Sequence, residues 1–299
     1  KLAEKVADHD KLVEAARAEI AKVDARIDAM RAKYAADPEF QKHEALLDNG
    51  IDLARLTYPE VRTLRCQMQY IFQDPYSSLN PRMTVANIIG EGLLAHKYCK
   101  KANERMHEEI LQTMEDCGLA PYFLHRYPHQ FSGGQRQRIG IARSLAVHPK
   151  FVVCDEAVSA LDVSIQSQII NLLQDLKEQQ HLTYLFITHD LSVVKYISDR
   201  IGVMYLGNLV ELADSQEIFD HPMHPYTEAL LESIPTTEEK RDLAVLEGDI
   251  PSPVNPPKGC KFHTRCKYCT EICTHVVPDW EEVTPNHFVA CHHKLHTNE

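Results

Sequence analysis

Two acidic side chains end an apolar run in the segment FVVCDE, which covers residues 151–156. A short apolar run of this kind predicts a buried strand, and ligands of an α/β sheet bind beyond the carboxyl ends of its strands. At that edge Asp155 can hold Mg²⁺ and Glu156 can orient an attacking water. Acids also end strands simply to meet solvent, so the motif has a structural alternative.

Two further polar side chains follow apolar runs in the same way. His189 lies in YLFITHD (184–190), and Gln73 lies in IFQDP (71–75). A histidine at a strand end can donate a hydrogen bond to a terminal phosphate, or it can be a purely structural hydrogen bonder. The amide of Gln73 can help to ligate Mg²⁺ or position a water.

The segment FSGGQ, residues 131–135, has the composition of a phosphate-binding turn. Gly133 and Gly134 carry no Cβ, so the backbone can approach a ligand closely. Ser132 supplies a hydroxyl, and the helix expected to begin near Gln135 directs its positive end toward the same point. The alternative is an N-cap serine in a glycine turn. The usual phosphate cradle, G-x-x-x-x-G-K-[S/T], is absent from the 299 residues.

Apolar runs and helical periodicity alternate along the middle of the chain. Buried strands are expected over residues 68–72, 151–155, 184–188 and 201–205. Between the second and third of these runs, a helical apolar face is formed by Ile165, Ile169, Leu172, Leu173 and Leu176. Helical patterns also fill residues 84–125. Strands that alternate with helices predict an α/β fold with a mostly parallel sheet covered by helices.

The start of the chain has a different pattern. Apolar side chains from Leu2 to Tyr34 recur at alternating steps of four and three, which is the a/d spacing of a coiled coil. This helix is expected to end at Asp37-Pro38, and a second short helix is expected over residues 39–47. The pair can be an exposed hairpin that packs on itself, or an arm that binds a partner.

Composition limits the class of protein. The chain has 299 residues, a formal net charge of -11 and nine cysteines. This acidic balance disfavours a general nucleic-acid binder. The sequence contains no stretch of 18 apolar residues and opens with no signal-peptide pattern. A cytosolic setting is therefore expected, where clustered cysteines more often bind metal than form disulfides.

A cysteine-rich tail follows a stiff, proline-rich linker, PSPVNPP, at residues 251–257. Its thiols are those of Cys260, Cys266, Cys269, Cys273 and Cys291. Four thiolates can hold Zn²⁺ or an iron–sulfur cluster. The alternative is a set of free thiols on a surface tail.

The order of these motifs resembles that of the ATP-binding cassette (ABC) ATPases. Gln73 stands where that family has its Q-loop, and residues 132–135 stand where it has its signature. Asp155-Glu156 matches the Walker B strand, residues 159–162 match the D-loop, and His189 matches the switch histidine. The segments QYIFQDPYSSLNPRMTV, RYPHQFSGGQRQRIGIARSL, HPYTEALLESIP and GCKFHTRC look like the ATPase subunits of bacterial oligopeptide/dipeptide importers.

The resemblance, which covers about residues 60–295, implies a role for each strand-end residue. Glu156 is the general base for the hydrolytic water, and His189 contacts the γ-phosphate of ATP. Asp155 and Gln73 serve Mg²⁺. The implied fold is a P-loop NTPase-like (RecA-like) core with the ABC helical subdomain.

The same resemblance implies that the glycine turn serves another subunit. Ser132, Gly133, Gly134 and Gln135 contact a nucleotide held by the facing subunit, and Asp162 lies on the dimer interface. Helical residues of about 84–130 form the subdomain that docks on the permease.

The implied domains are a helical insertion arm (1–50), a partial ABC ATPase domain (51–235) and a C-terminal extension typical of oligopeptide transporters (236–299). A recurrent set of four tail cysteines is matched by Cys260, Cys266, Cys273 and Cys291. The family suggests a [4Fe–4S] cluster there, with Zn²⁺ as the alternative. Cys269 looks like an extra thiol.

The implied function is an ATPase that uses ATP and Mg²⁺ to power import of oligopeptides or dipeptides. It would lie at the cytoplasmic face of the bacterial plasma membrane. Its partners would be a second ATPase subunit, identical or not, two permease subunits and, indirectly, an extracytoplasmic solute-binding protein. The alternatives are a soluble ABC ATPase of DNA repair or chromosome maintenance, and a non-hydrolysing subunit that lends its signature loop to a partner.

Two departures from the family pattern affect these expectations. Ala157 stands where the family usually has proline, which removes no catalytic atom. The chain has no Gly-Lys pair and therefore no P-loop. We expect a sequence truncated inside a helical insertion, with a naturally degenerate site as the alternative. Without the backbone cradle and its lysine, this chain is expected to bind ATP poorly by itself.

Overall fold

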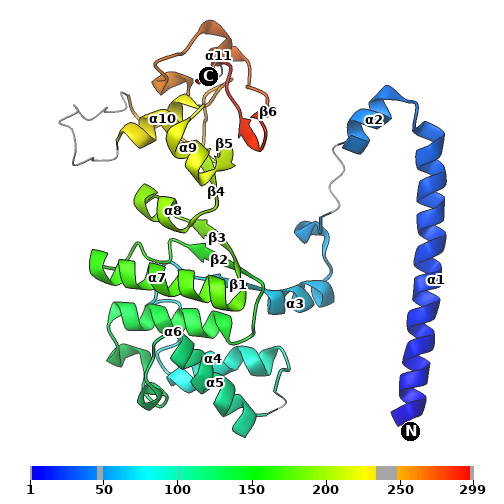
Figure 1. The fold of residues 1–299 in the computed structure, drawn as a ribbon, viewed down its shortest axis with the longest axis vertical. Helices are drawn as coiled ribbons and strands as arrows, with labels where there is room; N and C mark the ends of the chain where they lie inside the picture. The colour runs from blue at the N-terminus through cyan, green and yellow to red at the C-terminus, as the bar shows by residue number, and fades with distance from the viewer. Residues whose placement is uncertain (1, 46–49, 100, 234–247, 297–299) are drawn as a thin grey trace. The chain divides into compact units, whose positions relative to one another are not determined.

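The computed structural model describes residues 2–45, 50–99, 101–233 and 248–296 (Figure 1). The chain divides into two compact units, residues 1–58 and residues 59–299. The first unit is helical. Among its described residues, the second contains helices and two separate sheets.

Two helices dominate the first unit. Helix α1 covers Leu2–Tyr34 and helix α2 covers Pro38–Ala45, which confirms the predicted long helix and its break at Asp37-Pro38. The Asp37 carboxylate accepts a hydrogen bond from the backbone N–H of Glu39 (2.9 Å), one of the donors that a helix start leaves unpaired. Residues 46 and 47 of the expected second helix lie outside the described residues. A short 3₁₀ turn follows at Leu53–Arg55.

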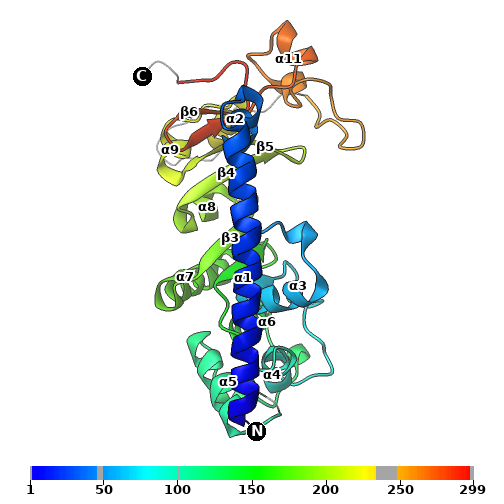
Figure 2. The ribbon, with the colours of Figure 1, turned by 90° about the vertical axis from the view of Figure 1, so that its right-hand side faces the viewer.

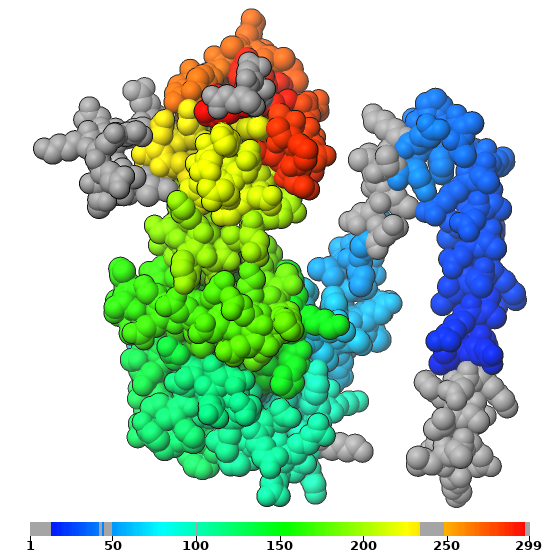
Figure 3. Space-filling model, in the orientation of Figure 1, coloured from blue at the N-terminus to red at the C-terminus, as the bar shows by residue number. Residues whose placement is uncertain are grey.

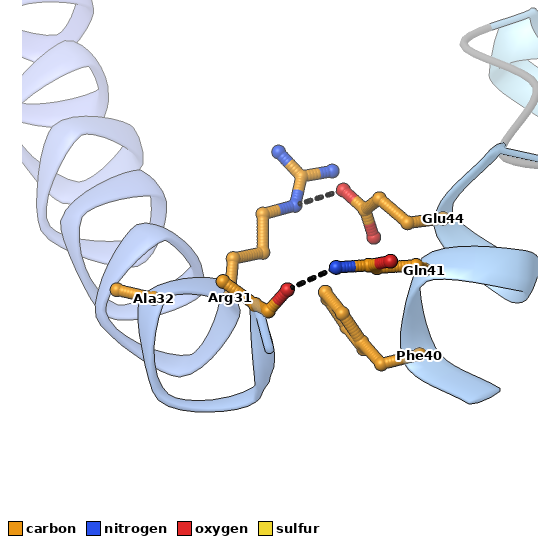
Figure 4. Close-up of a pocket in the computed structure, with 6 residues that line it drawn as sticks. Arg31, Ala32, Phe40, Gln41 and Glu44 are labelled. Atoms are coloured by element: carbon orange, nitrogen blue, oxygen red, sulfur yellow. Dashed lines mark hydrogen bonds and ion pairs between the residues drawn. The ribbon is translucent and has the colours of Figure 1, made fainter. Parts of the chain in front are cut away.

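The two helices contact each other where α1 ends (Figure 4). Arg31 Nε lies 2.8 Å from Glu44 Oε1, and the Gln41 amide donates a hydrogen bond to the backbone carbonyl of Ala35 at 2.7 Å. A pocket at this contact is lined by Arg31, Ala32, Ala35, Phe40, Gln41 and Glu44. Before this contact, toward the start of α1, several side chains of the heptad pattern are exposed: Val13, Ile20, Val23, Ile27 and Met30.

Three strands form a parallel sheet in the second unit. They are β1 (Met68–Ile71), β2 (Phe151–Asp155) and β3 (Thr183–Ile187), in the order β1-β2-β3. The structure therefore confirms the three strands that the sequence predicted here. Because the strands are parallel and in register, their carboxyl ends lie at one edge of the sheet.

Helices α6 (Gly133–Leu145) and α7 (Val163–Gln180) pack on this sheet. The core side of α7 is formed by Ile169, Ile170, Leu173 and Leu176. The predicted face was therefore nearly right, with Ile165 and Leu172 only partly buried beside it. The space-filling view shows these green segments closely packed (Figure 3).

The predicted helical region before α6 contains α4 (Val85–Ala95) and α5 (Glu104–Asp116). Two 3₁₀ turns follow, at Pro121–Phe123 and Pro128–Gln130. Both helices bury apolar faces, which are formed by Val85, Ile88, Ile89, Leu93, Met106, Ile110 and Met114. Figures 1 and 2 both show α4 and α5 beside α6.

A second sheet is antiparallel. Its strands are β4 (Arg200–Tyr205), β5 (Asn208–Asp214), β6 (Glu281–Thr284) and β7 (His287–Val289), in the order β4-β5-β7-β6. The predicted strand at 201–205 is confirmed, but it lies in this antiparallel sheet and not in the parallel one. Leu206 and Gly207, with φ of 44° and 77°, form a two-residue turn that folds β5 back antiparallel to β4.

Short helices complete the second unit: α3 (Tyr58–Gln67), α8 (Leu191–Ile197), α9 (Ser215–Asp220), α10 (Pro225–Glu232) and α11 (Glu271–His275). Strand β7, from the C-terminal part of the chain, pairs with β5. The antiparallel sheet therefore joins strands from both sides of the expected boundary at residue 235. Among the described helices, none combines the length and the apolar character needed to cross a bilayer.

Candidate functional site

The strand-end edge of the parallel sheet brings three predicted residues together. The Gln73 amide Nε2 donates a hydrogen bond to Glu156 Oε2 at 2.5 Å. On the other side of the same carboxylate, His189 Nδ1 lies 3.1 Å from Glu156 Oε1. These side chains follow β1, β2 and β3 respectively, so the parallel register delivers all three to one place. Glu156 is the centre of the cluster.

The backbone at Glu156 has an unusual conformation. Its φ is 44°, a left-handed value that is uncommon for a residue with a Cβ and that is enriched at functional sites. The N–H of Glu156 donates to the carbonyl of Ile187 on β3 at 2.9 Å, which holds the chain against the neighbouring strand as it leaves β2. The turn thereby directs the carboxylate toward Gln73 and His189.

Asp155, the last residue of β2, has a partner that sequence reasoning missed. The hydroxyl of Tyr70 on β1 donates a hydrogen bond to Asp155 Oδ2. This hydrogen bond, more than burial, raises the pKa of Tyr70. Tyr70 lies three residues before Gln73, and an aromatic residue in a strand carries no signal for such a contact. Carboxylate and amide oxygens are ligands that suit Mg²⁺, so Asp155 and Gln73 fit this ion by donor chemistry.

The glycine turn begins a helix in the way that its structural alternative describes. Ser132 is the N-cap of α6, and its hydroxyl accepts a hydrogen bond from the backbone N–H of Gln135 (3.4 Å). The Gln135 side chain accepts in return from the N–H of Ser132 (3.2 Å), completing a capping box. A capped N-terminus still presents positive backbone dipoles, so the phosphate interpretation stays a prediction.

The turn packs closely on the start of α7. A Cβ on Gly134 would lie 2.4 Å from Ile165 Cγ2, so only glycine fits this approach without a shift. Asp162 caps α7 by accepting hydrogen bonds from the Ile165 N–H (3.1 Å) and the Ser164 hydroxyl (2.9 Å). These hydrogen bonds, led by that of Ile165, lower the pKa of Asp162. The signature-like turn and the D-loop-like aspartate are therefore neighbours.

The tail cysteines lie in one region without forming a metal site in the described structure. Cys260 N–H donates to the carbonyl of Cys273 at 2.9 Å. The pKa of Cys266 is raised to about 11 and that of Cys291 to about 12, mainly by burial and to a smaller extent by neighbouring cysteines. Within residues 248–296 and the rest of the described chain, no three Cys, His, Asp or Glu side chains are arranged to hold a metal ion. Cys269 is exposed.

A second feature that sequence reasoning missed is a buried carboxylate in the antiparallel sheet. Glu211 on β5 is fully buried and lies 2.8 Å from His287 Nε2 on β7. It also accepts the backbone N–H groups of Met223 (2.6 Å) and His224 (3.1 Å). Three segments of the second unit therefore meet at one side chain. The pattern of β5 marks Glu211 only as an acid in a strand.

Two family models match the chain. The model described as "ABC transporter" matches residues 35–159. The model described as "Oligopeptide/dipeptide transporter, C-terminal region" matches residues 210–273. The first match includes the strand ends at Gln73 and Glu156, and the second includes Cys260, Cys266 and Cys273.

Curated relatives carry transport names. The oligopeptide transport ATP-binding protein AppF of Bacillus subtilis (strain 168) is 52% identical over 253 residues, which is 83% of this chain and 76% of the relative. The oligopeptide transport ATP-binding protein OppF of Haemophilus influenzae is 47% identical over 246 residues, which is 81% of this chain and 74% of the relative.

A solved structure supports the same fold. The ATP-binding cassette MJ0796, in a dimeric post-hydrolysis state bound to ADP and Pi, is 27% identical and superposes with a TM-score of 0.50. The match covers 56% of this chain and 72% of that one. Taken with the strand-end cluster and the relatives, this shows that the chain belongs to the ABC transporter family of ATP-hydrolysing proteins and carries the C-terminal region of oligopeptide/dipeptide transporters.

Proposed function

We propose that this chain is the ATP-hydrolysing subunit of an importer for oligopeptides or dipeptides. The observation that carries the proposal is the placement of Glu156 between Gln73 and His189 at the carboxyl edge of the parallel sheet. The peptide class rests on the matched C-terminal region and on the relatives that are named for oligopeptide transport.

In this proposal Glu156 takes a proton from the attacking water. Its two carboxylate oxygens are held by different neighbours, Gln73 and His189, so the group is oriented before the substrate arrives. Asp155 and Gln73 would hold Mg²⁺, and His189 would donate toward the terminal phosphate. When bound, Mg²⁺ would act as the Lewis acid, and ATP would supply the phosphoryl group that is transferred to water.

The proposal also includes the assembly. Ser132, Gly133, Gly134 and Gln135 would complete the nucleotide site of a second ATPase subunit, with Asp162 at the interface between them. The described structure supports this because the turn and Asp162 meet at the start of α7. The helical residues of about 84–130 would dock on the permease at the cytoplasmic face of the bacterial plasma membrane. The complex would include two permease subunits, with a solute-binding protein on the other side.

We also propose three functional parts, an arm at 1–50, an ATPase domain at 51–235 and a C-terminal extension at 236–299. The pairing of β5 with β7 supports an extension that folds onto the ATPase part. The exposed heptad side chains of α1 support an arm with a surface of its own.

In the extension, Cys260, Cys266, Cys273 and Cys291 would bind a [4Fe–4S] cluster, or Zn²⁺ in its place. Their thiol chemistry suits either one, although the described arrangement does not form a site in advance. Iron, sulfide and zinc should be measured after anaerobic purification of the wild type, Cys266→Ser and Cys269→Ser. We expect metal in the wild type and in Cys269→Ser, with loss in Cys266→Ser. A wild type without iron or zinc would contradict the assignment.

The hydrolysis proposal is tested in the assembled transporter. Glu156→Gln keeps the shape of the side chain and removes the base, so we expect ATP turnover to fall at least about 100-fold. Glu178→Gln, at an exposed position on α7, is the control and should stay near the wild type. Turnover that is unchanged in Glu156→Gln would favour the alternative of a non-hydrolysing subunit. Import of labelled peptide into vesicles tests the substrate class.

A further inference from the structure

Two arginines on α6 contact the segment that follows Gln73. Arg136 is 8% exposed, and its guanidinium carbon lies 3.8 Å from the centroid of the Tyr76 ring. The same side chain donates from Nε to the carbonyl of Pro128 (2.7 Å) and from Nη2 to that of His129 (3.4 Å). Arg136 is therefore held rigidly by backbone acceptors while its planar face meets Tyr76.

Arg143 lies seven residues further along α6, on the same side of the helix. Its Nη1 donates to the carbonyl of Ser78 at 2.5 Å, and its guanidinium carbon lies 5.6 Å from the centroid of the Phe72 ring. The next residue, Ser144, donates from its hydroxyl to the carbonyl of Tyr70 at 3.0 Å. Residues 70–78 are thus attached to α6 on both sides of Gln73.

We propose that Arg136 and Arg143 are positioning residues that couple the segment around Gln73 to the turn at Ser132. The coupling makes these two parts of the nucleotide machinery move together. This inference rests on the proposed function, because it gives the two arginines a role in transmitting the effect of the transported peptide to ATP hydrolysis.

The path of the coupling is short and consists of rigid parts. Gln73 contacts the Glu156 carboxylate, and Tyr76 lies three residues further along the chain. Tyr76 contacts Arg136, which is in the first turns of α6. The capping box joins that turn to Ser132, which is the N-cap of the same helix. A displacement at Tyr76 therefore reaches Ser132 through one side-chain contact and one helical turn.

The chemistry of the contact requires arginine rather than any cation. A guanidinium can donate in its plane to two carbonyls and present its face to a ring at the same time, whereas an ammonium is a point charge that cannot do both. Arg136→Lys therefore keeps the charge and loses the geometry. Tyr76 is 64% exposed, so removing its ring takes little from the core. Tyr76→Ala and Tyr76→Phe form a matched pair, because only the first loses the ring face.

The first test measures ATP turnover of the assembled transporter with and without peptide. For Tyr76→Ala and Arg136→Lys we expect the ratio of stimulated to basal turnover to fall about fivefold, with the Michaelis constant for ATP unchanged. Tyr76→Phe should keep the ratio of the wild type. A normal ratio in Tyr76→Ala would overturn the inference. If the wild type itself shows no stimulation by peptide, the proposed function fails instead.

The second test does not depend on transport. Hydrogen exchange of the Gln135 and Arg136 amides is measured in this chain, because both amides are bonded to Ser132. Tyr76→Ala should accelerate exchange at these amides severalfold, and Tyr76→Phe should not. Circular dichroism checks that the helices stay folded. Equal exchange in Tyr76→Ala and the wild type would show that the segment and the turn are independent, which overturns the coupling.

Discussion

The imidazole Nδ1 of His189 lies 3.1 Å from Oε1 of Glu156, although 33 residues separate them in the sequence. The side chain of His189 is 75% exposed and that of Glu156 is 28% exposed, so the contact is open to a ligand on one side. The histidine after β3 and the acid after β2 therefore contact each other at the strand-end edge of the sheet. Under the proposed function, we expect the histidine to orient the carboxylate.

Replacement of His189 by alanine is expected to lower ATP turnover of the assembled transporter about 100-fold, because a misplaced catalytic group costs about this much. Steady-state kinetics at saturating ATP provide the measurement. His221→Ala is the matched control, since His221 also faces a glutamate, Glu217, at 3.6 Å but lies on another element. A similar loss in both variants would show that the effect is not specific to the cluster.

Two glycines of α6 predict opposite effects of the same substitution. Gly134→Ala places a methyl group 2.4 Å from Ile165 Cγ2 and should destabilise the protein by about 1–3 kcal/mol through overpacking. For Gly140→Ala, no atom outside the neighbouring backbone of α6 lies within 4 Å of the new Cβ, so the variant should gain about 0.5–1 kcal/mol from helix propensity. Urea unfolding measures both changes. Equal midpoints would contradict the close approach of α6 to α7.

Because of the buried His224, we expect the folded protein to lose stability in acid. Burial lowers the pKa of His224 to about 4, against the smaller opposing effect of Glu211, so the folded protein keeps the ring neutral. The unfolded chain takes up this proton near pH 6.5, where the folded protein does not. Unfolding therefore becomes easier as the pH falls from about 6.5 to about 4, with a total loss of about 3 kcal/mol.

The check on His224 is urea unfolding at several pH values. His224→Asn keeps an acceptor for the backbone N–H of Tyr226, which His224 Nδ1 accepts at 3.0 Å in the wild type. This variant removes only the titration, so its stability should change less between pH 7 and pH 4. If the free energy of unfolding of this variant falls with pH as steeply as that of the wild type, other groups cause the acid sensitivity.

Glu211 is expected to be the most sensitive position of the antiparallel sheet. Glu211→Ala leaves His287 and two backbone N–H groups without their acceptor in a buried site, and should cost about 3–5 kcal/mol. Thermal unfolding and limited proteolysis of the region after residue 248 provide the measurement. Glu217→Ala, at a half-exposed position, is the control and should cost about 0.5 kcal/mol or less. A mild effect of Glu211→Ala would contradict a structural role for this carboxylate.

Much of the site could be predicted from local pattern. Apolar runs that end in Gln73, Glu156 and His189 predicted three strand ends, and parallel strands necessarily bring their carboxyl ends to one edge. The turn at Ser132 and Gly134 predicted the start of a helix, because a helix cap involves only residues that are close in the sequence. Side-chain types and short spacings are sufficient for these features.

Other features depend on which segments meet, and no local pattern encodes this. An apolar run at 201–205 predicted a strand, but the turn at Leu206 and Gly207 placed it in a different sheet. The contacts of Tyr70 with Asp155 and of Tyr76 with Arg136 join residues 85 and 60 positions apart.

The sequence by itself determined the family, the three strand ends and the long first helix, because periodicity and motif order are properties of neighbouring residues. Only the tertiary structure decided the division into two sheets, the buried Glu211 and the attachment of the Gln73 segment to α6. The physical reason is that hydrogen bonds and packing between distant segments depend on their arrangement in space, which short-range patterns of polarity do not specify.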